Sequence, residues 1–271
     1  MIKVDNPIIA LMSDFGEDDY FVPSLKGVIA SINPEAKVVD ITHNIPSFDV
    51  LAGSFVLFAS YRFFPKKTIF VAVIDPGVGS SRKIFLVETD KYCFIAPDNG
   101  ILSLVLEEEG VYRATEISNP KFFLSQTSVT FDGRDKMAPV SAWLSLGVPP
   151  EEFGPSIKDI QKNELSLPHQ TDEKIQGVVL YKDKFGNLIT NISLSQLDPF
   201  LKKYGREDVC LIAGDNTIMY GDFYSAVPTG ESVFLFGSLG LIEIAVREGS
   251  AFDKLKVKPG DRIKIELLNN Q

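Results

Sequence analysis

Four acidic loops in the first half of the chain carry residue types from which a polar ligand site can be made. Each combines aspartate with glycine, and they read Asp14-Phe-Gly, Asp75-Pro-Gly, Asp98-Asn-Gly and Asp132-Gly-Arg-Asp135. A single Asp-Gly turn usually marks only a chain reversal. The first three, however, follow predicted strands, and in an open parallel sheet ligands bind beyond the carboxyl ends of the strands. We therefore expect at least these three loops to converge on one site.

The chemistry open to such carboxylates is limited. A carboxylate at a strand end can accept hydrogen bonds from both hydroxyls of a ribose, and it can pair with an ammonium or a sulfonium. Arg82 follows Asp75 across the glycine-bearing turn PGVGSS, which can fold the guanidinium back toward the carboxylate. The alternative is a surface ion pair of little energetic value.

A second polar segment lies in the last third of the chain and reads Asp183-Lys-Phe-Gly-Asn187. An aromatic ring beside an amide suits a nucleobase, because the ring stacks on the base and the amide hydrogen-bonds its edge. On these residues alone, a hairpin turn that buries Phe185 in the core is the simpler interpretation.

Several common site motifs do not occur. The sequence holds no GxGxxG after its first predicted strand, no GxxxxGK[ST], no GxSxG and no His-x-x-x-His pair. Its only histidines are His43 and His169. We expect His43, beside a strand end, to be a hydrogen-bonded structural group and His169 to be solvated. A histidine metal site or a Ser-His-Asp triad is therefore not expected.

Composition narrows the class of protein further. The 271 residues are 45% hydrophobic and carry a net charge of −9, which argues against a nucleic-acid groove and suits a cationic ligand. No apolar run approaches the roughly 20 residues that span a bilayer, and the N-terminus lacks a signal-peptide pattern. Cys93 and Cys210 are far apart and fit a pair of buried thiols. We expect a cytoplasmic protein without nucleic-acid or membrane partners.

Strands and helices alternate in the first half of the chain. Short apolar runs predict strands at 8–12, 37–42, 68–74, 84–88 and 92–97. Helical spacing covers 20–32, 49–61 and a segment that ends at Gly110. This alternation predicts an N-terminal α/β domain, residues 1–160, with a mostly parallel sheet flanked by helices.

The pattern changes after Gly147. The stretch 147–174 is rich in proline and charge and is interpreted as a connection, with the linker itself at 161–174. Beyond it, turns such as GDN, PTGE and KPGD separate short strands, which read GVVLYKD, VCLIAG, NTIMYG, SVFLFG, LIEIAV and RIKIELL. Residues 175–271 are therefore predicted to form a smaller, antiparallel β-barrel domain.

Seven segments in this order resemble the adenosine-forming S-adenosyl-L-methionine (SAM) hydrolases, also called SAM hydroxide adenosyltransferases, which are relatives of the fluorinases and chlorinases. The segments are LMSDFGEDDYFVPSLKGVI, VVDITHNIPSFDVLAG, FVAVIDPGVGSSR, IAPDNGILS, TFDGRDKMAPVSAWLSLG, DKFGNLITNI and SLGLIEIAVREGSA. The resemblance covers nearly the whole chain. It implies the same two domains, hydrolysis of SAM to adenosine and L-methionine without cofactor or metal, and a homotrimer with ligands between subunits.

The resemblance also implies roles for individual residues. Asp75 and Arg82 match two members of the family's Asp-Arg-His set, which holds the attacking water. The implied substrate contacts are Asp14 at the ribose hydroxyls, Asp19 and Asp183 at the methionine ammonium, Phe48, Phe185 and Phe223 around the ribose and adenine, Asn187 at adenine, and Ser238 at the methionine carboxylate.

The chain departs from the family pattern at two positions. Where the family reads Phe-His-Gly-Arg-Asp, Asp132 replaces the histidine. Aspartate is shorter and anionic, so two carboxylates facing Arg82 would repel each other, and we expect one of them to hold a proton. Asp132 would then act as base or weaken catalysis. At the second position, Leu239 stands where the halogenases carry an arginine near the methionine carboxylate.

Three alternatives to hydrolysis stay open. A 5′-halogenase fits the resemblance less well, because Asp75 and Arg82 belong to the hydrolase pattern and the short link ETDKYC lacks the fluorinase insertion. Asp132 suggests a protein that binds adenosine or SAM without turnover. The acidic loops by themselves would suit a magnesium-dependent phosphatase.

Overall fold

The structure of the chain, a computed structural model, describes residues 8–124, 130–163 and 168–268. The chain divides into two units, Met1–Asn163 and Glu164–Gln271. Among the described residues, no helix combines the length and the apolar character needed to cross a membrane.

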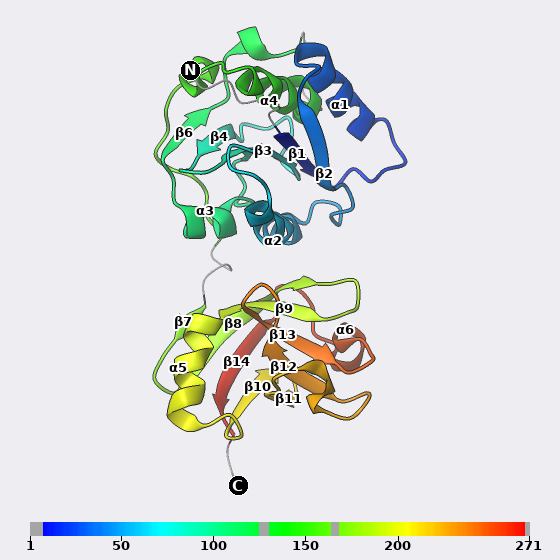
Figure 1. Cartoon of the computed structure of the whole chain (residues 1–271), viewed down its shortest axis with the longest axis vertical. Coiled ribbons are helices and arrows are strands. Elements are labelled where there is room, and N and C mark those ends of the chain that lie inside the picture. Colours follow the sequence, from blue (N-terminus) through cyan, green and yellow to red (C-terminus); the bar gives the residue numbers. More distant parts are fainter. Residues whose placement is uncertain (1–7, 125–129, 164–167, 269–271) are drawn as a thin grey trace. The chain divides into compact units, whose positions relative to one another are not determined.

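A six-stranded sheet in the order β2-β1-β3-β5-β4-β6 forms the centre of the N-terminal unit (Figure 1). β1, β2, β3 and β5 run parallel, whereas β4 and β6 are antiparallel to their neighbours. Only residues 89–92 link β4 to β5, and a parallel crossover needs about a dozen residues, so the two strands form a hairpin. The strands are β1 Ile8–Ser13, β2 Lys37–Thr42, β3 Ile69–Val73, β4 Ile84–Glu88, β5 Cys93–Pro97 and β6 Arg113–Glu116.

Helices cover both faces of this sheet, as the alternating pattern predicts. Figure 1 shows α1 and α4 on one face and α2 and α3 on the other. Asp49 caps α2, because its side chain accepts a hydrogen bond from the Ala52 amide at 2.9 Å. A π-helix, Gly133–Met137, leads directly into α4. The helices are α1 Phe21–Ile32, α2 Val50–Ser60, α3 Ser103–Glu109 and α4 Ala138–Ser145.

The stretch after Gly147 packs on the N-terminal unit as far as Asn163, so it is not all connection. Phe153 is fully buried. The amide of Glu116 donates to the carbonyl of Pro155 at 2.9 Å, and that of Ile157 donates to the carbonyl of Ala114 at 3.0 Å. These bonds occupy the outer edge of β6, a strand that was not expected from the sequence. An irregular segment can satisfy a sheet edge without any periodicity of its own.

An antiparallel sheet in the order β11-β10-β14-β8-β9-β13-β12 forms the C-terminal unit, with β7 beside β8. An isolated bridge between Tyr220 and Phe234 joins the end of β11 to β12, so the sheet nearly closes into the predicted barrel. The strands are β7 His169–Gln170, β8 Lys174–Lys182, β9 Leu188–Ser193, β10 Val209–Ala213, β11 Asn216–Met219, β12 Ser232–Phe236, β13 Leu241–Val246 and β14 Arg262–Leu267.

The described part of the C-terminal unit also contains two α-helices, α5 Leu194–Tyr204 and α6 Ala251–Leu255. Neither α5 nor β9 was expected from the sequence. α5 begins with a capping box between Ser193 and Gln196, and it buries Leu197, Phe200 and Leu201. Pro199 is the sixth residue of this helix, so its nitrogen donates no hydrogen bond to the preceding turn.

Candidate active site

A buried ion pair between Asp75 and Arg82 lies at the carboxyl end of β3. Arg82 Nε donates to Asp75 Oδ1 at 2.7 Å, and Arg82 Nη2 contacts Asp75 Oδ2. Gly77 makes room for this turn, since a Cβ there would lie 3.1 Å from Arg82 Cγ. The two side chains are only 11% and 7% exposed. The pair is therefore shielded from solvent and is not a surface ion pair.

The same guanidinium reaches a second carboxylate. Arg82 Nη2 lies 2.5 Å from Asp132 Oδ2, and the Asp132 side chain is also buried. Asp132 immediately precedes the π-helix, whose wide turn brings Lys136 back over it. Lys136 Nζ lies 2.8 Å from Asp132 Oδ1. Four side chains thus form a continuous chain of opposite charges, in the order Asp75, Arg82, Asp132 and Lys136.

The structure places Asp75 and Asp132 both against Arg82, and it adds a cation that the sequence analysis did not consider. The expectation counted two carboxylates against Arg82 alone and missed Lys136, which supplies a second cation. Two carboxylates facing two cations need no extra proton for neutrality. The spacing of Asp132 and Lys136, four residues apart in a helical segment, was the available signal.

Two carboxylate oxygens of this cluster can each accept a further hydrogen bond. Asp75 Oδ2 and Asp132 Oδ1 are buried and accept no directed hydrogen bond from the described residues. Each touches a cation, Arg82 or Lys136, away from the hydrogen-bonding direction. Buried polar atoms generally have a partner, so each is able to accept a bond from a bound donor such as water.

Asp14 ties the loop after β1 to the loop before α2. Its Oδ2 accepts a hydrogen bond from the Phe48 amide at 2.8 Å. Phe48 has a φ of 67°, which is rare for a bulky residue, and its side chain is 70% exposed. The loop thus holds an aromatic ring out beside a carboxylate. Asp19 is exposed on the loop before α1, where its Oδ1 accepts the Tyr20 amide at 2.7 Å.

The loop after β5 has a structural role. Asn99 Nδ2 donates to the carbonyl of Ile74 at 2.8 Å, which holds the backbone just before Asp75. Asp98 Oδ1 accepts the Gln161 amide at 2.7 Å. This third acidic loop therefore supports the end of β3 and anchors the segment that follows Gly147.

His43 is a buried structural group, as the sequence predicts. Its Nδ1 lies 2.7 Å from Ser13 Oγ, and its Nε2 lies 3.1 Å from Asp40 Oδ1. The three residue types are those of a hydrolytic triad, but Ser13 is fully buried at the end of β1 and cannot reach a substrate. His169 is exposed in β7. Within the described part of the chain, no three His, Cys, Asp or Glu side chains are grouped to hold a metal ion.

In the C-terminal unit, Asp183 organises the turn between β8 and β9. Its Oδ1 accepts the amides of Phe185 and Asn187, both at 2.8 Å, and its Oδ2 accepts Asn187 Nδ2 at 3.0 Å. The turn leaves Phe185 74% exposed. The simpler interpretation, in which this ring belongs to the core, is therefore wrong.

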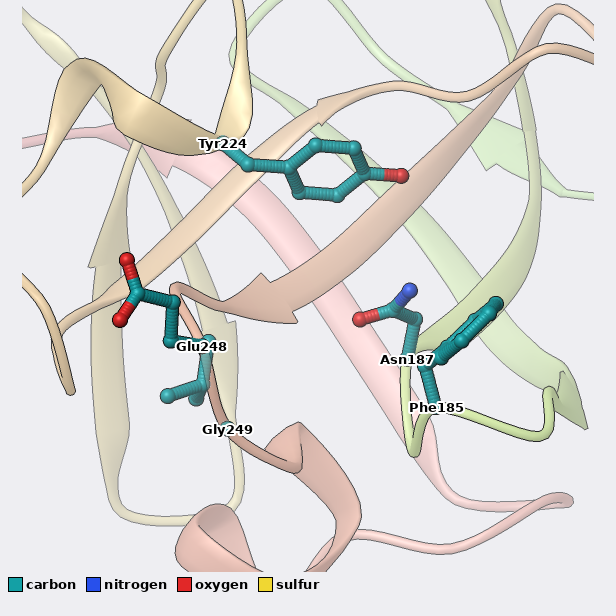
Figure 2. Close-up of a pocket in the computed structure, with 6 residues that line it drawn as sticks. Phe185, Asn187, Tyr224, Glu248 and Gly249 are labelled. Carbon is teal, nitrogen blue, oxygen red and sulfur yellow. The ribbon is translucent and has the colours of Figure 1, made fainter.

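Phe185 and Asn187 line an open pocket of about 480 Å³. Figure 2 shows them on one loop, with Tyr224 on the facing side and Glu248 and Gly249 along another wall. An aromatic ring, an amide and a phenol around one hollow are suited to a planar heterocycle with polar edges. Phe223, which is exposed, directly precedes Tyr224.

Tyr224 and its partner Glu243 were not expected from the sequence. The Tyr224 hydroxyl donates to Glu243 Oε1 at 2.6 Å. Burial raises the pKa of Glu243, and the charge of Asp183 adds to the effect. Glu243 lies beside the turn that carries Ser238, since a Cβ on Gly237 would lie 2.8 Å from Glu243 Oε2. The sequence did contain a signal for Glu243, because it is the one acidic residue within the apolar run LIEIAV.

Two family models match this chain. The SAM hydroxide adenosyltransferase N-terminal domain matches residues 9–154, and the corresponding C-terminal domain matches residues 177–264. The chain belongs to the SAM hydroxide adenosyltransferase family. The resemblance inferred from the sequence segments is confirmed.

Relatives of this SAM hydroxide adenosyltransferase family member match it over nearly its whole length. A protein of Salinispora arenicola named (R)-S-adenosyl-L-methionine hydrolase is 33% identical over 262 residues, which cover 96% of this chain and 97% of the relative. An Actinoplanes protein named fluorinase is 30% identical and covers 89% and 91%. A crystal structure of an uncharacterized conserved protein from Thermotoga maritima is 38% identical, with a TM-score of 0.86 over 95% of this chain and 99% of that one.

Proposed function

We propose that this protein hydrolyses SAM to adenosine and L-methionine. The observation that carries the proposal is the buried set of Asp75, Arg82 and Asp132 in a family member whose full-length relatives include named SAM hydrolases. The set joins an arginine to carboxylates that retain acceptor capacity, as the binding and activation of a water molecule require.

The chemical step is a displacement at C5′ of the substrate. The water oxygen forms a bond to C5′ while the C5′–S bond breaks, and the electron pair of that bond returns to sulfur. Methionine leaves as a neutral thioether, so sulfur needs no general acid. The water loses one proton, which Asp75 or Asp132 accepts and passes to solvent, while Arg82 stabilises the developing hydroxide character. The water must lie opposite sulfur in a site shielded from bulk solvent.

We further propose that the substrate is bound as the family resemblance implies. Asp14 would hold the ribose hydroxyls beside Phe48, and the pocket of Phe185 and Asn187 would take adenine. That pocket's size and polar edges support this assignment. The remaining proposed contacts are Phe223 at adenine, Asp19 and Asp183 at the ammonium, and Ser238 at the carboxylate.

The names of the relatives suggest which sulfonium epimer is the substrate. Four of them are named for the (R) epimer of SAM. We therefore propose that this chain prefers (R)-SAM. The halogenase alternative has less support, because the hairpin between β4 and β5 is only residues 89–92 long.

A homotrimer in the cytoplasm completes the proposal. Three large rings with proposed ligand roles, Phe48, Phe185 and Phe223, are exposed in the isolated chain, and a ligand or a second subunit would cover them. Cys93 and Cys210 are free thiols, which suits a reducing compartment. Light scattering should give three times the chain mass. A monomer that still binds adenosine would contradict the trimer.

The decisive experiment offers the purified protein each SAM epimer in turn and identifies the products. We expect adenosine and L-methionine, faster from the (R) epimer, with ¹⁸O from labelled water in the 5′-hydroxyl. Chelators should not change the rate, and chloride or fluoride should yield no 5′-halo nucleoside. Binding of adenosine without turnover of either epimer would instead favour the binding-protein alternative.

A further inference from the structure

Lys136 contacts the water-holding set through Asp132 and not through Arg82 or Asp75. We propose that Lys136 is a positioning residue that allows Asp75 and Asp132 to be ionised together against Arg82, and that it thereby sets the lower pH limit of the reaction. The inference rests on the proposed hydrolysis, but its electrostatic part can be tested without turnover.

The balance of charges in the cluster supports this role. Without Lys136, two carboxylates whose side chains are 7% and 5% exposed would share one guanidinium, which leaves a net charge of −1 in a buried site. Such a site gains stability by taking up a proton. That proton would occupy a carboxylate oxygen that must be free to accept a proton from the attacking water. With Lys136 Nζ at 2.8 Å from Asp132 Oδ1, the four groups are neutral without it.

Among the described residues, Lys136 and Arg82 are the cations that form ion pairs with Asp132. The neighbouring Arg134 and Asp135 pair with each other at 2.6 and 3.0 Å. Besides Asp132, Lys136 Nζ has an aromatic contact, to the Phe123 ring at 5.9 Å. The Lys136 side chain is 24% exposed, so its charge is partly hydrated and inexpensive to keep.

The first test compares pH–rate profiles of the parent with Lys136→Met and Lys136→Arg. In Lys136→Met we expect the acidic limb of the profile to move upward by about one pH unit or more, the usual effect of an opposite charge at this distance. At high pH the rate should return toward that of the parent, and adenosine affinity should not change. Lys136→Arg should keep the parent profile.

A matched control is available in the C-terminal unit. Lys202 forms the same i,i+4 pair with Asp198, at 2.6 Å on the exposed surface of α5. Lys202→Met should leave the profile where it is. A Lys136→Met profile that coincides with the parent, or one lowered equally at every pH, would overturn the inference, because a purely structural role predicts those results.

The second test does not need turnover. Infrared difference spectra should show an additional protonated carboxyl group in Lys136→Met at neutral pH, and the double variant Asp132→Asn, Lys136→Met should lose that band. Absence of the band in folded Lys136→Met would overturn the inference even if hydrolysis is established. If the parent forms no adenosine, the proposed function fails, while this measurement still decides how Lys136 acts.

Discussion

Gly133 lies against Val73 at the end of β3, so closely that a Cβ on residue 133 would be 2.9 Å from Val73 Cγ1. This contact fixes the start of the π-helix against the strand that leads to Asp75. Because Asp132 is the adjacent residue, the same contact sets the distance between Asp132 and Arg82.

Gly133→Ala should therefore lower both stability and turnover. Overpacking of this kind typically costs about 1–3 kcal/mol, and relief of the clash would move Asp132 away from Arg82. Thermal unfolding and the rate of adenosine formation measure the two effects. Gly27→Ala in α1 is the control, since a Cβ there would meet no described neighbour within 4 Å and the change should be neutral or stabilising. Equal effects of the two substitutions would argue against close packing at Gly133.

Asp14→Ala should weaken adenosine binding. Hydrogen bonds to charged groups contribute about 1.5–3 kcal/mol, so Kd should rise roughly 10- to 100-fold. The change would also release the Phe48 amide and relax its unusual backbone. Calorimetry with adenosine measures the loss. Asp98→Ala removes a comparable loop contact, to Gln161, and should leave Kd unaltered. If Kd is unchanged in Asp14→Ala, Asp14 stabilises only the turn and does not bind adenosine.

Arg82→Lys should abolish most of the turnover although it keeps the charge. Lysine lacks the planar fork with which Arg82 donates from Nε to Asp75 and from Nη2 to Asp132, so it would lose at least one of these directed bonds. Loss of one preorganised donor typically costs about 10²–10³ in kcat. We expect a loss of this size in the rate of adenosine formation, with little change in adenosine affinity. A variant with parent-like turnover would remove Arg82 from the mechanism.

Asp132→His restores the family residue but leaves Lys136 without its carboxylate. The cluster would then hold two cations and one carboxylate, so the second cation should hinder the histidine from accepting a proton. We expect the double variant Asp132→His, Lys136→Met to form adenosine faster than Asp132→His alone. Rates measured over a range of pH would show this dependence. If Asp132→His is faster than the parent, and adding Lys136→Met does not change its rate, then Lys136 is not coupled to residue 132.

Glu243→Gln should change how stability depends on pH. Burial raises the pKa of Glu243 above its ordinary 4.5, so the folded state binds this proton more tightly than the unfolded state. Stability is then lost as pH rises from 4.5 through the folded pKa. Gln cannot ionise and keeps an oxygen for the Tyr224 hydroxyl. As pH rises through this range, the free energy of unfolding of Glu243→Gln, measured by denaturant titration, should increasingly exceed that of the parent. Glu207→Gln, at an exposed position, should follow the parent at every pH.

The amino-acid sequence by itself determined the order of β1 to β5 and of α1 to α3 in the N-terminal unit. Largely apolar runs such as 8–12 and 68–74 predict buried strands, and Asp14 and Asp75 come just after those runs. The seven matching segments were enough to identify the family. These features are local, because periodicity, turn chemistry and short motifs are read within a few residues.

The tertiary structure decided which charges meet. Arg82 and Asp132 are fifty residues apart, and their contact depends on the sheet order and on the π-helix, neither of which a local pattern encodes. The partnership of Lys136 with Asp132 depends on a side-chain direction at that helix. Burial of Glu243 likewise depends on a distant neighbour, Tyr224, which hydrogen-bonds its carboxylate. Burial determines how strongly charges interact, so the electrostatics of this site became definite only with the fold.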